Sequence, residues 1–289
     1  MYLKFFGLNQ KPFGLTPDPK FLFFSEKHRE GLDHLLYGIH QKEGFVLISG
    51  DTGTGKTTLC RALLERLDSG EVTTALILNP LLSEEELLKA ILEDFGLPAK
   101  GATRKQLLDV LNDFLLKSLA AGKTTVLIID EAQNLSTRCL EQVRLLSNLE
   151  TDKEKLIQII LVGSEELPAK LELPELRHLQ QRISLRYQLR PLNKEETGRY
   201  LQHRLNMARG AGSTSFEKVA HREIYRFSKG VPRLINMIAE RALLAAYLAE
   251  SRQIKQVHVL EGRQSLSGRS PSNQSKLFLW FSHNKHRAS

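Results

Sequence analysis

The sequence predicts an α/β fold, in which helices enclose a parallel sheet of five strands and a small all-helical unit follows. Five short apolar runs alternate with helical patterns through the first 190 residues, as in parallel strands joined by crossover helices. From Pro191 onward the strand pattern stops and only helical periodicity follows. We expect a sheet-containing domain over residues 1–190, including an N-terminal strap and helix over 1–40, then a helical lid over 191–262. A disordered, basic, Ser-rich tail is expected over 263–289.

The expected strands are short runs without internal glycine or proline, at residues 45–48, 73–78, 125–129, 156–162 and 183–187. Expected helices have apolar residues at helical spacing, at residues 25–39, 58–64, 83–95, 103–115, 136–149, 174–182, 193–208, 216–228 and 231–250. Three of them open on a capping box, begun by Ser83, Thr103 and Asn193. These helices are expected to cover both faces of the sheet and to build the second unit.

The first expected strand leads into the octapeptide GDTGTGKT, which fits the phosphate-binding pattern G-x-x-x-x-G-K-[ST]. Its glycines let successive main-chain N–H groups face inward, at the start of a helix, where an anion is favoured. Lys56 is expected to reach the β- and γ-phosphates of a nucleotide, and the Thr57 hydroxyl to ligate Mg²⁺. The expected nucleotide-binding residues are Gly50, Asp51, Thr52, Gly53, Thr54, Gly55, Lys56, Thr57 and Thr58.

Two carboxylates, Asp130 and Glu131, follow the third apolar run directly. Ligands of open α/β sheets bind at the carboxyl ends of the strands, so both acids are expected beside the phosphate loop. Asp130 is a candidate Mg²⁺ ligand, directly or through water. Glu131 is a candidate base for the water that attacks the γ-phosphate.

Further polar residues at strand ends and helix junctions are candidates for catalysis. Ser164 follows the fourth run and is a candidate γ-phosphate sensor or a simple turn residue. Arg182 joins a helix to the fifth run, where it is the better candidate for an arginine finger entering a neighbouring subunit, with Arg177 second. Arg233 lies in the first turn of a helix in Gly230-Val231-Pro232-Arg233, where the helix dipole opposes a cation, so it is expected to face an anion such as ATP phosphate.

Composition excludes several classes of protein. Hydrophobic content is 41% and charged content 26%, as in soluble globular proteins. Two cysteines without metal-type spacing suit a reducing compartment, so a cytoplasmic protein is expected. Of the net charge of +8, residues 251–289 carry +6, so residues 1–250 carry only +2, which gives little support for a DNA-binding face. Residues 1–24 are rich in Phe and Pro, as expected of a strap over the core or of a wall for the adenine ring.

Taken together, these motifs resemble AAA+ ATPases with a helical lid, and more narrowly the ATPase module of the general secretion pathway protein A (ExeA-like) family. The likeness covers about residues 2–262, and it is carried by Phe6–Ile39, Gly50–Leu64, Leu127–Ser136, Leu140–Thr151, Lys155–Gly163, Pro174–Ile183 and Gly230–Tyr247. It implies an ATP-driven oligomer with Mg²⁺ as cofactor. It also implies Lys56 and Thr57 on phosphate and Mg²⁺, Asp130 on Mg²⁺, Glu131 as base, Arg182 as finger and Arg233 as second sensor.

The sequence departs from this family at two points. The family usually has Gly-Gln-Pro-Glu-Leu after the fourth strand, whereas this chain has Gly163-Ser164-Glu165-Glu166-Leu167, with a shorter side chain at the first sensor. Full-length secretion members continue into a membrane helix and a periplasmic part. Here Leu277–Phe281 is five apolar residues, too short to span a bilayer, and is either a weak membrane or partner anchor or a ragged end.

The resemblance implies a homo-oligomer that assembles with ATP and works on an envelope or secretion-system partner, with membrane association at most peripheral to the inner membrane. Two alternatives remain: an ATP-gated loading or regulatory module with little turnover, and a DNA-transposition-type ATPase, for which DNA is a disfavoured partner. Pilus and exopolysaccharide systems share the module, so the pathway is left open. A two-domain helicase, suggested by Asp130-Glu131-Ala132-Gln133, is discounted because the chain lacks room for a second motor domain.

Overall fold

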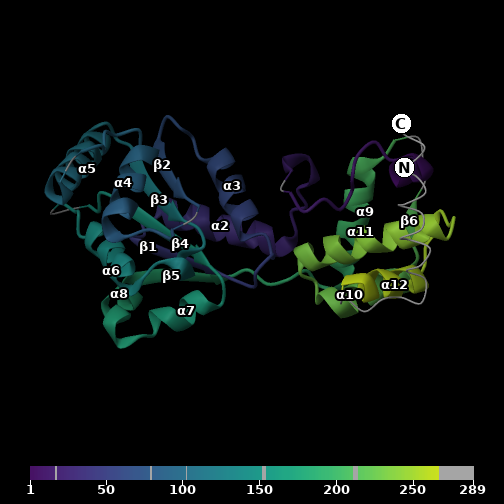
Figure 1. The fold of residues 1–289 in the computed structure, drawn as a ribbon. Coiled ribbons are helices and arrows are strands. Elements are labelled where there is room, and N and C mark those ends of the chain that lie inside the picture. The colour runs from purple at the N-terminus through teal and green to yellow at the C-terminus, as the bar shows by residue number, and fades with distance from the viewer. Residues whose placement is uncertain (17, 79, 102, 152–153, 211–213, 267–289) are drawn as a thin grey trace. The chain divides into compact units, whose positions relative to one another are not determined.

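The protein divides into two compact units in the computed structural model, which describes residues 1–16, 18–78, 80–101, 103–151, 154–210 and 214–266 (Figure 1). The sheet unit is Phe24–Arg190. The helical unit combines Met1–Phe23 with the residues from Pro191 onward. Each unit has its own hydrophobic cores and is described by itself.

A five-stranded parallel sheet forms the centre of the sheet unit, in the order β2-β3-β4-β1-β5. Its strands are β1 (Phe45–Ser49), β2 (Val72–Ile77), β3 (Thr124–Ile129), β4 (Gln158–Gly163) and β5 (Ile183–Gln188). The predicted fold class is confirmed, and every predicted strand forms, with ends that differ by at most two residues. Because β1 lies between β4 and β5, the loop that follows it opens between the carboxyl ends of two neighbouring strands.

The helices of the sheet unit are α2 (Glu26–His40), α3 (Lys56–Arg66), α4 (Glu84–Asp94), α5 (Arg104–Ala120), α6 (Thr137–Leu146), α7 (Glu166–Leu171) and α8 (Arg177–Arg182), with short 3₁₀ turns at Ala132–Asn134 and Pro174–Leu176. Ser83 and Thr103 form the predicted capping boxes with Glu86 and Gln106. Helix α6 ends at Leu146, before the predicted residue 149, because the Ser147 hydroxyl donates to the main-chain oxygen of Arg144 and caps the last turn.

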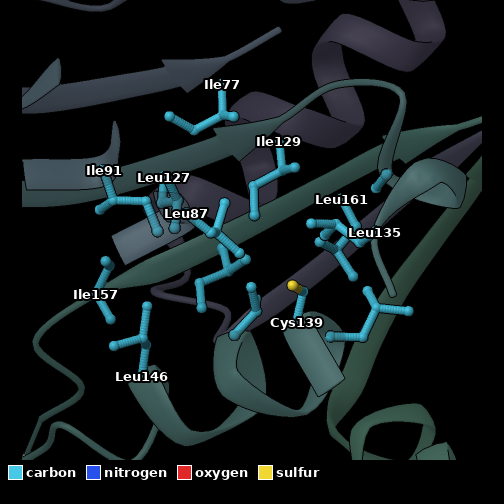
Figure 2. Packing of buried hydrophobic residues seen from close by; sticks show 14 of the residues in the cluster. Ile77, Leu87, Ile91, Leu127, Ile129, Leu135, Cys139, Leu146, Ile157 and Leu161 are labelled. Carbon is cyan, nitrogen blue, oxygen red and sulfur yellow. The ribbon is translucent and has the colours of Figure 1, made fainter. Parts of the chain in front are cut away.

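Alternate residues of each strand face opposite layers of helices, which is why the strand sequences are apolar throughout. In β1, Phe45 and Leu47 join the core under α4–α8, whereas Val46 and Ile48 join the core under α2 and α3. Figure 2 shows the first of these cores, where side chains of α4 and α6 meet those of the sheet. Leu87, Leu127, Ile129 and Leu161 there are fully buried, and truncating one of them to alanine costs about 2–5 kcal/mol.

The helical unit consists of α1 (Tyr2–Phe6), a 3₁₀ turn at Pro19–Phe21, α9 (Lys194–Ala208), α10 (Lys218–Ser228), α11 (Pro232–Leu248) and α12 (Gln256–Leu266). Two-residue strands, β6 (Ser215–Phe216) and β7 (Gln253–Ile254), pair with each other beside the helices. Asn193 and Glu196 form the predicted capping box of α9. Gly230, at φ 82°, lies two residues beyond the end of α10, and a β-carbon there would overlap the main-chain oxygen of Leu192, so only glycine fits.

The first 23 residues belong to the helical unit, not to the sheet-containing domain in which residues 1–40 were expected. Phe6, Phe13 and Phe21 are buried in the core that α9 and α11 share. Arg204 of α9 donates to the main-chain oxygens of Pro12 (2.5 Å) and Gly14 (3.1 Å), which holds the segment in place. The expected strap therefore exists, and it covers the core of the helices. Of residues 1–40, only residues 24–40 belong to the sheet unit.

The basic region after Glu250 is also more structured than expected. Residues 253–266 form β7 and α12, and Ile254 and Val259 are buried in the core of the helical unit. The predicted disordered tail therefore does not include 263–266. The rest of the predicted tail, with Leu277–Phe281, lies outside the described residues. Among the described helices, none is both long and apolar enough to cross a bilayer.

Candidate nucleotide-binding site

The loop after β1 forms an anion nest. It runs from Gly50 to Gly55, and α3 begins at Lys56. Gly55 has φ 106°, and a β-carbon there would lie 2.7 Å from Nε2 of His28, so glycine is required. In the part of the chain that the structure describes, the main-chain N–H groups of Gly55, Lys56 and Thr57 make no hydrogen bond. Unpaired N–H groups at a helix start are the donors that bind phosphate.

The Lys56 side chain is held against the loop by main-chain oxygens of the loop itself. Its ammonium donates to the main-chain oxygens of Gly50 (2.9 Å) and Asp51 (3.1 Å), and only 5% of the residue is exposed. Burial lowers the pKa of Lys56, and the carboxylates of Glu131, Asp130 and Asp51 oppose that shift. A cation that is poorly hydrated and lacks a direct carboxylate partner is suited to bind an incoming anion.

Thr57 and Asp130 are brought together although 73 residues separate them in the sequence. The Thr57 hydroxyl donates to Oδ2 of Asp130 at 2.5 Å, and the Glu131 main-chain N–H donates to Oδ1 at 2.9 Å. Burial raises the pKa of Asp130, and these two hydrogen bonds act against the shift. A hydroxyl beside a carboxylate is the oxygen pair that Mg²⁺ takes alongside phosphate and water, so this pair fits the predicted metal site.

Glu131 is held in an unusual main-chain conformation beside Asp130. Its φ is 53°, in the left-handed region that few residues other than glycine adopt. Its carboxylate accepts a hydrogen bond of 2.6 Å from the Gln133 amide. The same amide accepts a hydrogen bond of 3.0 Å from the main-chain N–H of Ser164, at the end of β4. Gln133 therefore links Glu131 to the neighbouring strand, a contact that sequence reasoning missed.

The Ser164 side chain has a local partner. Its hydroxyl accepts a hydrogen bond of 3.4 Å from the Glu166 N–H, at the start of α7. This hydrogen bond is the one expected of a simple turn residue. The main chain of Ser164, not its side chain, contacts Gln133. Its predicted sensor role remains a prediction. Asp51 and Thr52 are exposed on the loop, Gly53 and Thr58 are half-buried, and Thr54 is buried.

His28 of α2 also contacts the loop, and sequence reasoning did not single it out. Its Nε2 lies 3.2 Å from the main-chain oxygen of Thr54, and its Nδ1 lies 2.7 Å from the hydroxyl of Ser25. Because a carbonyl oxygen only accepts, Nε2 is the donor to Thr54, and Nδ1 forms the second hydrogen bond with the Ser25 hydroxyl. Sequence spacing of 26 residues gave no signal for this contact, since it depends on how α2 packs beside the loop.

The two finger candidates are both exposed on the sheet unit. Arg182, at the end of α8, donates to the Ser147 hydroxyl at 2.7 Å, and so lies at the end of α6. Arg177 begins α8. Neither forms an ion pair with another described residue of this chain.

Arg233 belongs to the other unit, in the first turn of α11, where Pro232 opens the helix as predicted. Its side chain is exposed, and it has no hydrogen bond or ion pair with the described residues. No acidic residue accompanies it in that turn, and the helix dipole opposes its charge. An external anion would therefore be a favourable partner for this side chain.

Comparison with known proteins agrees with this geometry. Residues 39–171, which contain the phosphate loop and the paired acids, match the AAA domain family. General secretion pathway protein A of Aeromonas hydrophila is 49% identical over 255 residues, which is 88% of this chain and 46% of that protein. Type II secretion system protein E of Pectobacterium carotovorum subsp. carotovorum is 38% identical over 69 residues, 24% of this chain and 13% of that protein. The chain thus spans less than half the length of either relative.

Solved structures share the fold at low identity. The Aeropyrum pernix ORC2 protein has a TM-score of 0.66 and 17% identity, covering 93% of this chain and 75% of that one. Drosophila ORC bound to DNA has a TM-score of 0.66 and 20% identity, covering 92% of this chain and 66% of that one. The Thermotoga maritima RuvB branch-migration motor has a TM-score of 0.55 and 20% identity, covering 84% of this chain and 69% of that one. The chain therefore carries an AAA domain of the P-loop type and is a relative of general secretion pathway protein A across most of its own length.

Proposed function

We propose that this protein is a Mg²⁺-dependent ATPase, which hydrolyses ATP to ADP and phosphate at the loop around Lys56. The observation that carries the proposal is the convergence of three groups at one sheet edge. The unpaired main-chain N–H groups of the loop and the buried ammonium of Lys56 can bind phosphate. Glu131 directly follows Asp130, which pairs with Thr57. Such a set can bind a triphosphate and also supply a base for the water that attacks it.

Each residue has a distinct task in this reaction. The loop N–H groups and Lys56 hold the β- and γ-phosphates and neutralise charge that develops during transfer. Mg²⁺, when bound by Thr57 and Asp130, would supply charge neutralisation and orientation of the phosphates. Glu131 accepts a proton from the attacking water while the water oxygen forms a bond to the γ-phosphorus. ADP leaves with the electrons of the broken P–O bond. Gln133 keeps the Glu131 carboxylate in position through its hydrogen bond of 2.6 Å.

Two arginines complete the proposal from outside this site. Arg182 is exposed, and its guanidinium has a neutral hydroxyl partner, so it is free to exchange that contact for phosphate on a neighbouring subunit. Arg233 is proposed to bind phosphate of the same chain's nucleotide as a second sensor in the helical lid. Together they imply a homo-oligomer that assembles with ATP. The likeness to general secretion pathway protein A supports a cytoplasmic ATPase that serves assembly of a secretion or envelope system.

Steady-state phosphate release by the purified full chain tests this function. With ATP and Mg²⁺ we expect turnover, and Glu131→Gln should lower it by roughly 10²–10⁴-fold while nucleotide still binds. The matched control is Glu93→Gln, which changes an exposed glutamate of α4 and should leave turnover unchanged. Binding without turnover in the wild type would instead favour the ATP-gated module. Turnover that survives Glu131→Gln would remove Glu131 from the role of base.

A further inference from the structure

Lys170 of α7 contacts the turn that carries Glu131 and Gln133. Its ammonium donates to the main-chain oxygen of Gln133 at 2.9 Å and to that of Leu135 at 2.5 Å. It forms no ion pair with another described residue. The position of this ammonium is therefore set by the two main-chain oxygens and not by a carboxylate. No sequence motif of the nucleotide site includes this lysine.

Both oxygens take their donor from outside the turn. The turn's own hydrogen bonds end on the main-chain oxygens of Glu131 and Ala132, and among the described residues no main-chain N–H donates to the other two. Leu135 is fully buried, at 0% exposure, so water cannot replace the ammonium at its oxygen. A buried main-chain oxygen without a donor is costly. Within the described part of the chain, Lys170 is thus the only donor to these oxygens.

The turn that Lys170 holds is strained at its first residue. Glu131 has φ 53°, a conformation that persists only where surrounding contacts hold it. The main-chain oxygen of Glu131 accepts a hydrogen bond of 2.9 Å from the Asn134 N–H, and the turn ends at Leu135. Lys170 therefore fixes the far end of a turn whose near end is strained. Loss of the ammonium would let the main chain at Glu131 relax.

Gln133 passes this constraint on to the Glu131 carboxylate. Its amide donates to the carboxylate at 2.6 Å and accepts from the Ser164 N–H at 3.0 Å, while its main-chain oxygen accepts from Lys170. Gly163 leaves room for this amide, since a β-carbon there would lie 2.7 Å from its Oε1. Gln133 is therefore fixed at its main chain and at its side chain, and both fix the direction of the carboxylate.

We propose that Lys170 is a positioning residue for the base Glu131. It acts through the turn and the Gln133 amide, without touching the nucleotide. The inference rests on the proposed ATPase function, in which the Glu131 carboxylate faces the water that attacks the γ-phosphate. A catalytic group misplaced by about 1 Å lowers a rate by roughly 100-fold. Loosening the turn should therefore lower turnover without weakening nucleotide binding.

Two measurements on variants of the full chain test this role. Lys170→Met removes the ammonium, so we expect turnover at saturating ATP to fall by roughly tenfold or more, with KM and ADP affinity unchanged within about twofold. Without nucleotide, amide hydrogen exchange at Ser164, followed by NMR, should become roughly tenfold faster, because its partner Gln133 is no longer held. Lys170→Arg keeps donors for both oxygens and should restore most of both properties. The matched control is Lys105→Met, which changes an exposed lysine of α5 and should behave as the wild type does.

Unchanged turnover in Lys170→Met, or unchanged exchange at Ser164, would overturn the positioning role. A loss of ADP affinity in step with turnover would also overturn it, as would a Lys170→Arg variant as impaired as Lys170→Met, since either result indicates general structural support. Circular dichroism checks folding, and if Lys170→Met does not fold, Lys170→Gln takes its place with the same expectations. A wild type that hydrolyses no ATP would remove the proposed function instead. The exchange comparison needs no nucleotide, so it still shows whether Lys170 holds the turn.

Discussion

Nε2 of His28 lies 3.2 Å from the main-chain oxygen of Thr54, inside the phosphate-binding loop. The Thr54–Gly55 peptide bond is trans, as are all described peptide bonds, so its oxygen and the Gly55 N–H point in opposite directions. By holding the oxygen on the side of α2, His28 keeps the Gly55 N–H turned toward the anion nest. His28 therefore contributes to the loop conformation that directs this N–H toward a phosphate.

Replacing His28 with asparagine or with glutamine tests its two side-chain hydrogen bonds one at a time. In His28→Gln the amide nitrogen can occupy the place of Nε2 and still donate to Thr54, whereas in His28→Asn it reaches only the place of Nδ1. We expect His28→Asn to weaken ADP binding by roughly threefold to tenfold, and His28→Gln to bind nearly as wild type does. Isothermal titration checks this, and equal affinities in both variants would contradict it.

Gln133 should affect turnover and leave affinity unchanged. Gln133→Met keeps the size of the side chain but removes the hydrogen bond to Glu131, so we expect turnover to fall by about tenfold. Gln133→Glu places a second carboxylate beside Glu131, and repulsion should lower turnover further. Gln181→Glu, on the exposed part of α8, is the control for the added charge. Loss of nucleotide affinity together with turnover would show that Gln133 acts on binding instead.

Asp130 is expected to destabilise the nucleotide-free protein. Burial raises its pKa, so the folded state binds the proton more tightly than the unfolded state, and the ionised carboxylate weakens folding at neutral pH. Asp130→Asn removes that cost, because the amide can still pair with Thr57 and the Glu131 N–H. We expect its free energy of unfolding at about pH 7 to exceed that of the wild type by roughly 1 kcal/mol.

Urea denaturation in a chelating buffer measures this difference. As the pH falls through the raised pKa toward 3.8, the ordinary value for Asp, wild-type Asp130 becomes protonated and the advantage of Asp130→Asn should shrink. An advantage that grows toward acid pH has the wrong sign for a raised pKa. A variant less stable than the wild type at neutral pH would mean that the carboxylate contributes more through its hydrogen bonds than it costs through burial.

Arg182 should act on the site of a neighbouring chain. Arg182→Ala is expected to bind nucleotide normally and to lose turnover by roughly 10³-fold or more. Lys56→Ala loses turnover for a different reason, because it cannot hold phosphate. In an equimolar mixture, the intact loop of one variant can meet the intact arginine of the other, so phosphate release should partly recover. A mixture no more active than its components would argue that Arg182 has no role in trans.

The sheet and the phosphate site could be predicted because their signals are local. Each strand is a continuous apolar run, and Gly50–Thr57 and Asp130-Glu131 each occupy a few consecutive residues at strand ends. The parallel topology then brings Thr57 and Asp130 together, since both follow strands at the same edge of the sheet.

Contacts between distant segments were not predictable in this way. The partners of His28, Gln133 and Arg182 depend on side-chain packing, which no local pattern encodes. The same holds for the aromatic N-terminal segment, whose burial against α9 requires a partner 190 residues away. Helix α12 was missed because its few apolar residues form no clear helical stripe, and Val259 shows its core contact only in the folded unit.

Equilibrium binding of Mg²⁺ with a non-hydrolysable ATP analogue tests the central claim most directly. If triphosphate binds in the nest around Lys56, the wild type should bind in the micromolar range, and Lys56→Ala should bind at least roughly tenfold more weakly. Lys100→Ala, an exposed lysine outside the site, should bind as the wild type does. Equal affinity in Lys56→Ala and the wild type, or no binding by the wild type, would contradict the account.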